Sequence, residues 1–430
     1  MVFWICTTSV VCIIAGMVYC KPYLGIVFVI VSIPFEGRIN NDGISIYPLE
    51  AILAILVLVC IYKSIVGEYN YLGNMKLVYC CIPFVLCIML SAMKSIEWSL
   101  TVKEIVRWLE LFVIYYITLK LINDEKKMRI ILYSMFLTVA IVSVLEIINY
   151  LNSLETNVDV VSRSGLFFGN VNPFAGYVNL IIPVIFGMIM ISVFLWERIM
   201  LGALAAVSII AWVLSFSKSG YLSLMLSFII VFLLVKAKKE VFLLVKSRKA
   251  IFLVLATLFA LIAIIFLFPV VREHFMERVK LETLLTTLDF RAECYSVVFD
   301  MLRDDLILGI GIGSYPLHIA KFTTNLYFVK HHLHSLYSQI LVETGFMGLS
   351  AFVFWLVCIV KYLVNSLKSF ENSRHYWLFV GLMGGVIVYL FNNLTDVLVV
   401  HGIHLQWGII LGLAVVLTQL RKPETCSKAV

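Results

Sequence analysis

The stretch HSLYSQILVETGFMGLSAFVFWLVCIV, residues 334–360, begins with an imidazole and continues as an apolar segment long enough to cross a membrane. It follows the one long polar segment of the chain, residues 272–333. His334 therefore stands where a polar segment passes into a membrane helix, at the boundary between lipid and water. A titratable imidazole at this boundary can reach a polar molecule on one side and a lipid-linked molecule on the other.

The composition around this stretch is that of a membrane protein. Of the 430 residues, 62% are hydrophobic and only 14% are charged, and the mean hydropathy is +1.03. A soluble chain of this length could not bury so much apolar surface. In lipid, each segment must satisfy its own backbone hydrogen bonds, which favours helices. The predicted fold class is all-α, a polytopic transmembrane helix bundle.

The apolar segments predict about 12 or 13 membrane spans in a single membrane domain, residues 1–430. The second segment is shorter than the roughly 20 residues that cross a bilayer, which makes it a candidate for a tilted or re-entrant helix. The residues at 272–333 form one extracytoplasmic loop with helix of its own. The expected spans lie near residues 3–20, 23–35, 48–66, 77–93, 104–122, 128–150, 173–195, 199–216, 219–235, 250–270, 335–360, 377–399 and 403–420.

Basic residues gather in a few short loops and in the C-terminal tail. If the spans alternate, these groups share one side of the membrane, and the positive-inside rule makes that side cytoplasmic. The loop at 272–333 then faces outward. The net charge of +7 arises from topology-setting residues, so it does not indicate a nucleic-acid partner. The groups are Lys126, Lys127 and Arg129; Lys236, Lys238, Lys239, Lys246, Arg248 and Lys249; Lys361, Lys368 and Arg374; and Arg421, Lys422 and Lys428.

The long loop carries a helical pattern followed by a glycine-rich break. Residues 282–308 have the apolar periodicity of a helix, and Gly309, Gly311 and Gly313 interrupt it. The glycine spacing is not a dinucleotide-binding fingerprint, because no βαβ unit surrounds it. A tight, close-packed turn is the favoured interpretation, and backbone contact with a phosphate is the alternative.

Several basic residues lie on the side that the positive-inside rule leaves poor in cations. Outward cations at the membrane surface suit a pyrophosphate that joins a sugar to a polyprenyl lipid, and the planar arginine fork can bond two of its oxygens. The alternative for any one of them is a solvated or snorkelling side chain. They are Arg38, Arg107, Arg163 and Lys218 near short loops, and Arg272, Arg278, Arg291 and Arg303 in the long loop. Glu110 lies three residues after Arg107 and is a candidate to neutralise it.

Three histidines cluster at the end of the long loop. They are His331, His332 and His334. Their spacing is not that of a zinc site, and no HExxH motif is present, so no metal is expected. For His334 a catalytic or substrate-contacting role competes with a satisfied structural histidine, and for its two neighbours the structural interpretation is favoured.

These motifs together resemble the O-antigen ligase and polymerase superfamily of bacterial envelope enzymes. The His motif is similar to His334-Ser335-x-Tyr337-x-x-x-Leu341-x-Glu343-x-Gly345-x-x-Gly348, with Ser335 where Asn is usual. Residues 291–315 resemble the Arg-led loop helix that ends in a glycine-rich turn. Residues 163–175 resemble the Gly/Asn segment, and 217–220 resemble the Ser-Arg-x-Ala hairpin, with Lys218 in place of Arg. The resemblance covers residues 160–420.

The resemblance implies glycosyl transfer outside the cytoplasm, from a glycan on undecaprenyl pyrophosphate to a glycan acceptor. It implies a metal-independent, inverting reaction without a cofactor, in a multi-pass protein of the bacterial inner or plasma membrane whose active site faces the periplasm or the exterior. His334 would be the general base, and Arg291, Lys218 and Arg163 would hold the pyrophosphate. Further candidate substrate contacts are Arg107, His331, Asn172 and Tyr337. Glu343 lies about 13 Å along the helix from His334 and is expected to be structural.

The favoured function is polymerisation of O-antigen or capsular polysaccharide repeat units, because nothing in the chain indicates a lipid A–core acceptor in particular. The alternative within the superfamily is a ligase that moves the glycan to lipid A–core or to a protein. A polysaccharide or lipid-linked sugar transporter is the rival from another class, although paired halves with broken helices are not evident. A membrane scaffold would leave the ordered outward cations and His334 unexplained. Expected partners are the lipid-linked donor, the acceptor, membrane lipid and a chain-length regulator protein.

Overall fold

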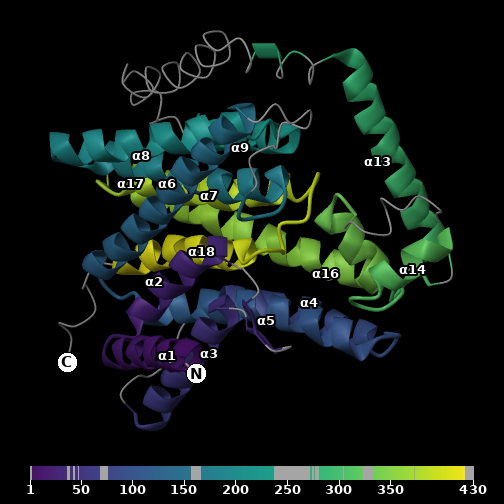
Figure 1. The fold of residues 1–430 in the computed structure, drawn as a ribbon, viewed down its shortest axis with the longest axis horizontal. Helices are drawn as coiled ribbons and strands as arrows, with labels where there is room; N and C mark the ends of the chain where they lie inside the picture. Colours follow the sequence, from purple (N-terminus) through teal and green to yellow (C-terminus); the bar gives the residue numbers. More distant parts are fainter. Residues whose placement is uncertain are drawn as a thin grey trace.

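The computed structural model is a bundle of helices with one short strand pair (Figure 1). It describes residues 2–35, 39–41, 44–46, 48–67, 76–155, 166–236, 272–273, 276, 280–303, 305–322, 333–371 and 373–421. In Figure 1 most helices of the bundle run side by side, and α13 (Leu281–Leu302) runs across the right-hand end. The predicted all-α bundle is confirmed.

The elements follow one another along the chain in this order. The first part has α1 (Val2–Cys20), α2 (Tyr23–Ser32), η1 (Ile33–Phe35), β1 (Ile39–Asn41), β2 (Ile44–Ile46), α3 (Pro48–Ile65), α4 (Lys76–Ala92), α5 (Trp98–Leu121) and α6 (Glu125–Glu155). The second part has α7 (Val171–Ile191), α8 (Leu195–Leu214), α9 (Lys218–Lys236), α13, α14 (Tyr315–Phe322), α16 (Leu336–Leu367), η3 (Lys368–Phe370), α17 (Tyr376–Asn392) and α18 (Ile403–Leu420). The two strands pair antiparallel, with Ile39 opposite Ile46.

Seven of the described helices are long and apolar enough to cross a membrane, namely α3, α6, α7, α8, α9, α16 and α18. Shorter apolar helices occur in α1, α2 with η1, α4 and α17. The second expected span is therefore a short helix that continues as a 3-10 turn. The expected span at 250–270 lies outside the described residues, so the total number of spans stays a prediction.

The tightest helix contact joins α7 and α17 through small residues. A Cβ atom on Gly381 would lie 2.5 Å from the Pro183 carbonyl oxygen, and one on Gly385 would lie 2.6 Å from that of Leu180. Only a residue without a side chain permits this approach, which is the usual way that membrane helices gain close packing. The C-terminal end of α17 is thereby fixed against the start of α7, where the site described below lies.

A break within α16 receives the glycine-rich turn. Gly345 has φ 68° and ψ −173°, so the helix bends there. The Ile310 N–H donates to the Val342 carbonyl at 2.9 Å, and the Phe346 N–H donates to the Leu306 carbonyl at 2.9 Å. The turn thus supplies the backbone partners that the broken helix lacks.

The turn requires glycine at these positions, because backbone from other segments lies directly against them. Gly309 has φ +70°, and a Cβ atom on it would lie 2.4 Å from the Val342 carbonyl oxygen. A Cβ atom on Gly313 would lie 2.8 Å from the Leu100 carbonyl oxygen at the start of α5. The close-packed turn predicted for this motif is confirmed.

The loop helix ends earlier than the sequence pattern predicts. It stops at Leu302, whereas the periodicity continues to Leu308. The side chain of Asp305 accepts hydrogen bonds from the N–H groups of Ile307 at 3.1 Å and Leu308 at 2.9 Å, which folds these residues into a turn. Residues 306–308 therefore form a turn and do not continue the helix, because Asp305 competes with the helix for their N–H groups.

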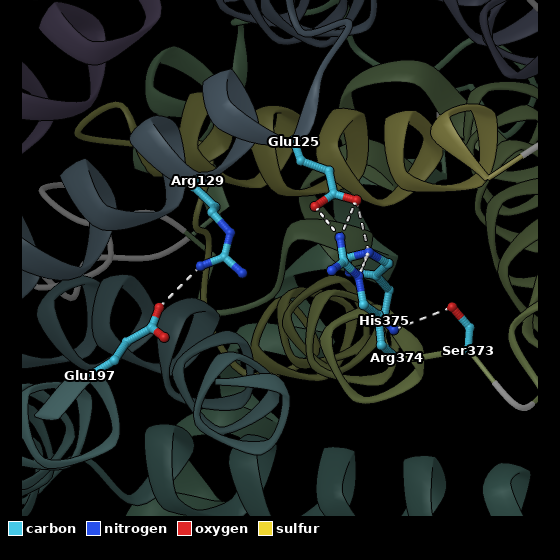
Figure 2. A network of polar contacts seen from close by, with 6 residues as sticks. All are labelled: Glu125, Arg129, Glu197, Ser373, Arg374 and His375. Carbon is cyan, nitrogen blue, oxygen red and sulfur yellow. Dashed lines mark hydrogen bonds and ion pairs between the residues drawn. The ribbon is translucent and has the colours of Figure 1, made fainter. Parts of the chain in front are cut away.

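An ionic network joins the starts of α6, α8 and α17 (Figure 2). Arg374 donates to both carboxylate oxygens of Glu125, at 2.8 and 2.6 Å, and His375 lies 3.0 Å from the same carboxylate. Arg129 pairs with Glu197 at 3.1 Å. Arg129 and Arg374 belong to groups that are predicted to be cytoplasmic. The network stands at the opposite end of α17 from the site described below.

Candidate active site

His334 lies directly before α16, on a backbone that is held from two sides. Ser335 is the N-cap of α16, and its hydroxyl accepts from the Ser338 N–H at 3.4 Å. The N–H of Leu336 donates to the carbonyl oxygens of Asn393 at 3.0 Å and Asp396 at 3.1 Å. Serine and asparagine are both good N-caps, so Ser335 preserves the local structure that the usual Asn would give.

The structure brings His334 and Arg291 to the same hollow. Arg291 and Tyr295 line it from α13, and His334, Ser335 and Ser338 line it from the start of α16. Arg291 and Tyr295 are one helical turn apart, so α13 presents both on one face. Arg291 is half-buried. Two residues that were singled out separately in the sequence, as a base and as an anion-binding cation, thus line one small space.

Asp396 lies in the connection between α17 and α18, where its charge interacts with that of Arg291. Its carboxylate accepts from the Val397 N–H at 2.8 Å, and the side chain of Asn172 and the charge of Arg291 also stabilise its ionised form. Burial acts in the other direction and dominates, raising the pKa of Asp396 to about 6. The ionised form of Asp396 therefore attracts the Arg291 guanidinium, and the protonated form does not.

Asn172 connects this acid to the hairpin that carries Lys218. The Ser217 hydroxyl donates to the Asn172 Oδ1 at 2.8 Å, and it accepts from the Gly220 N–H at 3.2 Å as the cap of α9. Hydrogen bonds therefore run from the hairpin through Asn172 to Asp396, and the charge of Asp396 interacts with that of Arg291. Lys218, the first residue of α9, is half-buried beside Ser217.

The α7 helix holds that hairpin in place from inside the bundle. The amide of Asn179 donates to the Gly220 carbonyl at 2.9 Å and to the Ser223 hydroxyl at 3.2 Å. The side chain of Asn179 is fully buried. Helix-to-helix hydrogen bonding explains why this polar residue lies inside the bundle.

Not every predicted site residue joins this group. Arg163 and His331 lie outside the described residues. The Tyr337 hydroxyl donates to the Leu390 carbonyl at 3.1 Å, and its ring meets that of Phe352 edge-on. Tyr337 therefore ties α16 to α17 and does not line the hollow, so the structure gives no support to its substrate-binding role.

Arg107 also lies apart from His334, in a second hollow on the other side of the first turns of α16. It pairs with Glu104 on α5. The predicted pairing with Glu110 is wrong, because the carboxylate of Glu110 lies 3.4 Å from the Nε2 atom of His404 on α18. Residues three apart in either direction share a helix face, so the sequence did not distinguish the two acids.

Glu343 belongs to this second hollow and not to the one that contains His334. It lines the hollow with Glu104, Arg107, Trp108, Ile312 and Gln339. Its carboxylate faces the backbone N–H groups of Gly313 and Tyr315 and the amide of Gln339. The sequence distance between His334 and Glu343 predicted this separation.

Asp396 is the site residue that sequence reasoning did not assign. The signal was an ionisable residue beside Asn392 and Asn393 at the outer end of an apolar segment. No local pattern connects it with Arg291, which lies more than 100 residues earlier in the chain. Only the packing of α17 against α7 brings it beside Asn172.

The described residues offer no metal site. In the part of the chain that the structure describes, no three His, Cys, Asp or Glu side chains lie close enough to hold a metal ion. His331 and His332 are outside that part, so metal independence stays a prediction. The hollow combines a base, a guanidinium and hydroxyl groups at the end of a membrane helix, which suits proton abstraction beside a bound anion.

Comparison with known families identifies the segment that contains this hollow. Residues 203–353 match the family described as O-Antigen ligase. The match confirms the resemblance to the O-antigen ligase and polymerase superfamily, and it includes Lys218, Arg291 and His334. The predicted wider range, 160–420, stays a prediction. No curated protein matches the chain.

Proposed function

We propose that this chain, which carries an O-antigen ligase domain, transfers a glycan from undecaprenyl pyrophosphate to a sugar hydroxyl on the outer side of a bacterial inner or plasma membrane. The observation that carries the proposal is the hollow shared by Arg291 and His334. A base and a fixed cation in one space are what transfer from a pyrophosphate requires. The base activates the acceptor, and the cation stabilises the leaving group.

The reaction balances with the groups of this site. His334 takes the proton from the acceptor hydroxyl, and the acceptor oxygen bonds to the anomeric carbon from the face opposite the pyrophosphate. The bond between that carbon and the pyrophosphate oxygen breaks, and the oxygen keeps the electron pair. Arg291 and Lys218 stabilise the charge that develops there, and Arg163 is a third candidate cation. Inversion at the anomeric carbon follows from a single displacement.

Asp396 and Asn172 act through the cations and the hairpin. Asp396 interacts with Arg291, and Asn172 receives the hydroxyl of Ser217 next to Lys218. We assign to them the positioning of the two cations, with no contact to the reacting atoms. Rigid support of this kind is what keeps charged groups at the geometry of the transition state.

Polymerisation of O-antigen or capsular repeat units is the form of the reaction that we favour. The proposed reaction needs only one hydroxyl group as acceptor, and no feature of the described residues indicates a lipid A–core acceptor. Transfer to lipid A–core or to a protein is the alternative. A polymerase would also meet a chain-length regulator protein in the membrane.

Deletion of the protein from its cells distinguishes the two forms. If the protein is a polymerase, its deletion leaves single repeat units on the carrier lipid. If it is a ligase, deletion leaves long polymer that has not been transferred to its acceptor. If the chain were a transporter, the purified protein would instead move lipid-linked glycan across vesicles without forming a bond.

Substitution of Arg291 tests the role of the hollow in the reaction. Purified protein in lipid nanodiscs, supplied with lipid-linked repeat unit, should form oligomers. Arg291→Ala should reduce transfer by about 100-fold, as expected when one charged stabiliser of a leaving group is lost. The matched control is Arg303→Ala at the end of the same helix, where the side chain is 79% exposed. Equal activity of Arg291→Ala and Arg303→Ala would contradict the proposal.

A further inference from the structure

The second hollow contains two buried acceptor atoms that lack partners. The Oε1 atoms of Gln339 and Glu343 are buried and make no hydrogen bond in the described part of the protein. Gln339 is 7% exposed and Glu343 is 2% exposed. The amide nitrogen of Gln339 is engaged with the carboxylate of Glu343. The Oε1 atoms that lack a partner on both residues can accept hydrogen bonds, and buried acceptors are rarely left unsatisfied.

The rest of the lining limits what can satisfy these acceptors. Trp108 and Ile312 provide apolar wall, and Arg107 with its partner Glu104 provides a polar edge. A free anion would meet the carboxylate of Glu104 and the carboxyl group of Glu343, so the group that enters must donate hydrogen bonds and have an apolar side. A sugar ring has both, with hydroxyl groups at its edge and C–H groups on its face.

The two hollows share their walls. Ser335 and Ser338 face the hollow of His334 and Arg291, whereas Gln339 on the next position faces the second hollow. The connection between α17 and α18 is shared in the same way, because Asp396 interacts with Arg291 and Val397 lines the second hollow. A glycan that passes over the N-terminal end of α16 would place one sugar at His334 and the next beside Gln339 and Glu343.

We propose that the second hollow is a glycan subsite, in which Gln339 and Glu343 accept hydrogen bonds from the hydroxyl groups of a sugar next to the reacting one. This rests on the proposed glycosyl transfer. The hollow has room for about one water-sized group, so a hydroxyl group at the edge of one ring enters it and the rest of the ring stays outside. The sugar belongs either to the acceptor glycan or to the glycan of the donor, and both present the same hydroxyl chemistry.

Transfer kinetics with two substrates tests the subsite and distinguishes the sources. The donor is the cells' own lipid-linked repeat unit, and the acceptor is the soluble oligosaccharide released from that lipid by mild acid. Gln339→Met removes the acceptor atom at nearly constant volume. It should raise one KM by about tenfold, the value of one hydrogen bond to a well-placed polar group, with kcat retained. A raised acceptor KM places the acceptor in the hollow, and a raised donor KM places the donor glycan there.

Glu343→Gln is the second variant, because it keeps the shape and one acceptor oxygen. It should raise the same KM as Gln339→Met. The matched control is Gln419→Met, on an exposed position of α18, which should change neither KM. If Gln339→Met and Glu343→Gln fold with the wild-type Tm and change neither KM, the hollow holds only structural water and the proposal fails.

Equilibrium binding separates this proposal from the proposed reaction. The soluble oligosaccharide should quench part of the tryptophan fluorescence of wild-type protein without any donor, and Trp108→Phe should remove that part. Gln339→Met should weaken the same binding by about tenfold. Binding without transfer would retain the subsite and refute the reaction. Transfer by a wild type whose Trp108 signal does not respond to the sugar would retain the reaction and refute the subsite.

Discussion

Replacement of Asp396 by Asn should change how the stability of the protein depends on pH. The group is only 9% exposed, and its pKa is raised from 3.8 to about 6, first of all by burial. A carboxyl with a raised pKa binds its proton more tightly in the folded state than in the unfolded state. The wild type should therefore lose stability as the pH rises through the range between about 4 and 6, and should then reach a plateau.

The size of this loss follows from the two pKa values. The interval between 3.8 and about 6 corresponds to about 3 kcal/mol. Asn cannot ionise, so Asp396→Asn should lack this part of the pH dependence. We expect the difference in unfolding free energy between variant and wild type to move in favour of the variant by about 2.4 kcal/mol between pH 4 and pH 7, because the unfolded carboxyl is already partly ionised at pH 4.

The assay is thermal or denaturant unfolding of both proteins in nanodiscs over that pH range. Taking the difference between the two proteins cancels the titration of all other groups. The control is Asp289→Asn, which replaces an exposed acid on α13 and should leave the pH dependence as in the wild type. Parallel curves for the wild type and Asp396→Asn would refute the inference that Asp396 is buried beside Arg291 in a costly ionised form.

Substitutions at three further positions test the framework of the site. Gly345→Ala should destabilise the protein by about 1–3 kcal/mol or more, because the residue has φ 68° and its Cβ atom would lie 2.1 Å from a carbonyl oxygen. Unfolding measurements should show no such loss for Gly202→Ala, where no atom lies within 4 Å of the added Cβ. Ser335→Asn should retain transfer activity since both residues cap α16, whereas Ser335→Ala should cost about 1 kcal/mol of stability; a loss of activity in Ser335→Asn would show that Ser335 does more than cap. Ser217→Ala removes the bond to Asn172 and should raise the donor KM several-fold in steady-state assays; an unchanged donor KM would separate the hairpin from donor binding.

The helices and the glycine-rich turn could be predicted because their signals are local. Apolar segments of membrane length mark the spans, and the alternation of glycines with apolar residues marks a turn against other backbone. The end of α13 could not be predicted from periodicity. Leu308 keeps the apolar pattern of the helix, but the side chain of Asp305 takes its N–H group. Competition between a side chain and the backbone is decided by geometry that the pattern does not contain.

The candidate site was predictable in its residue types but not in its partnerships. Arg291 and His334 each had a sequence signal, and the structure places them around one hollow. The interaction of Asp396 with the charge of Arg291 depends on how helices distant in sequence pack. The same is true of the choice between Glu104 and Glu110 as the partner of Arg107, because His404 on α18 lies against Glu110. The proposed glycan subsite could not be predicted from the sequence either, because Gln339 belongs to no sequence motif. Its proposed role depends on its facing Glu343 across one helical turn.

The activity of His334→Ala in the purified system tests most directly whether His334 is the base. This variant should bind the lipid-linked donor as the wild type does and should form no glycosidic bond above background. His318→Ala, on the loop helix α14, is the matched control and should form product at the wild-type rate. Product formation by His334→Ala at the wild-type rate would contradict the central claim that His334 is the base of a glycosyl transfer.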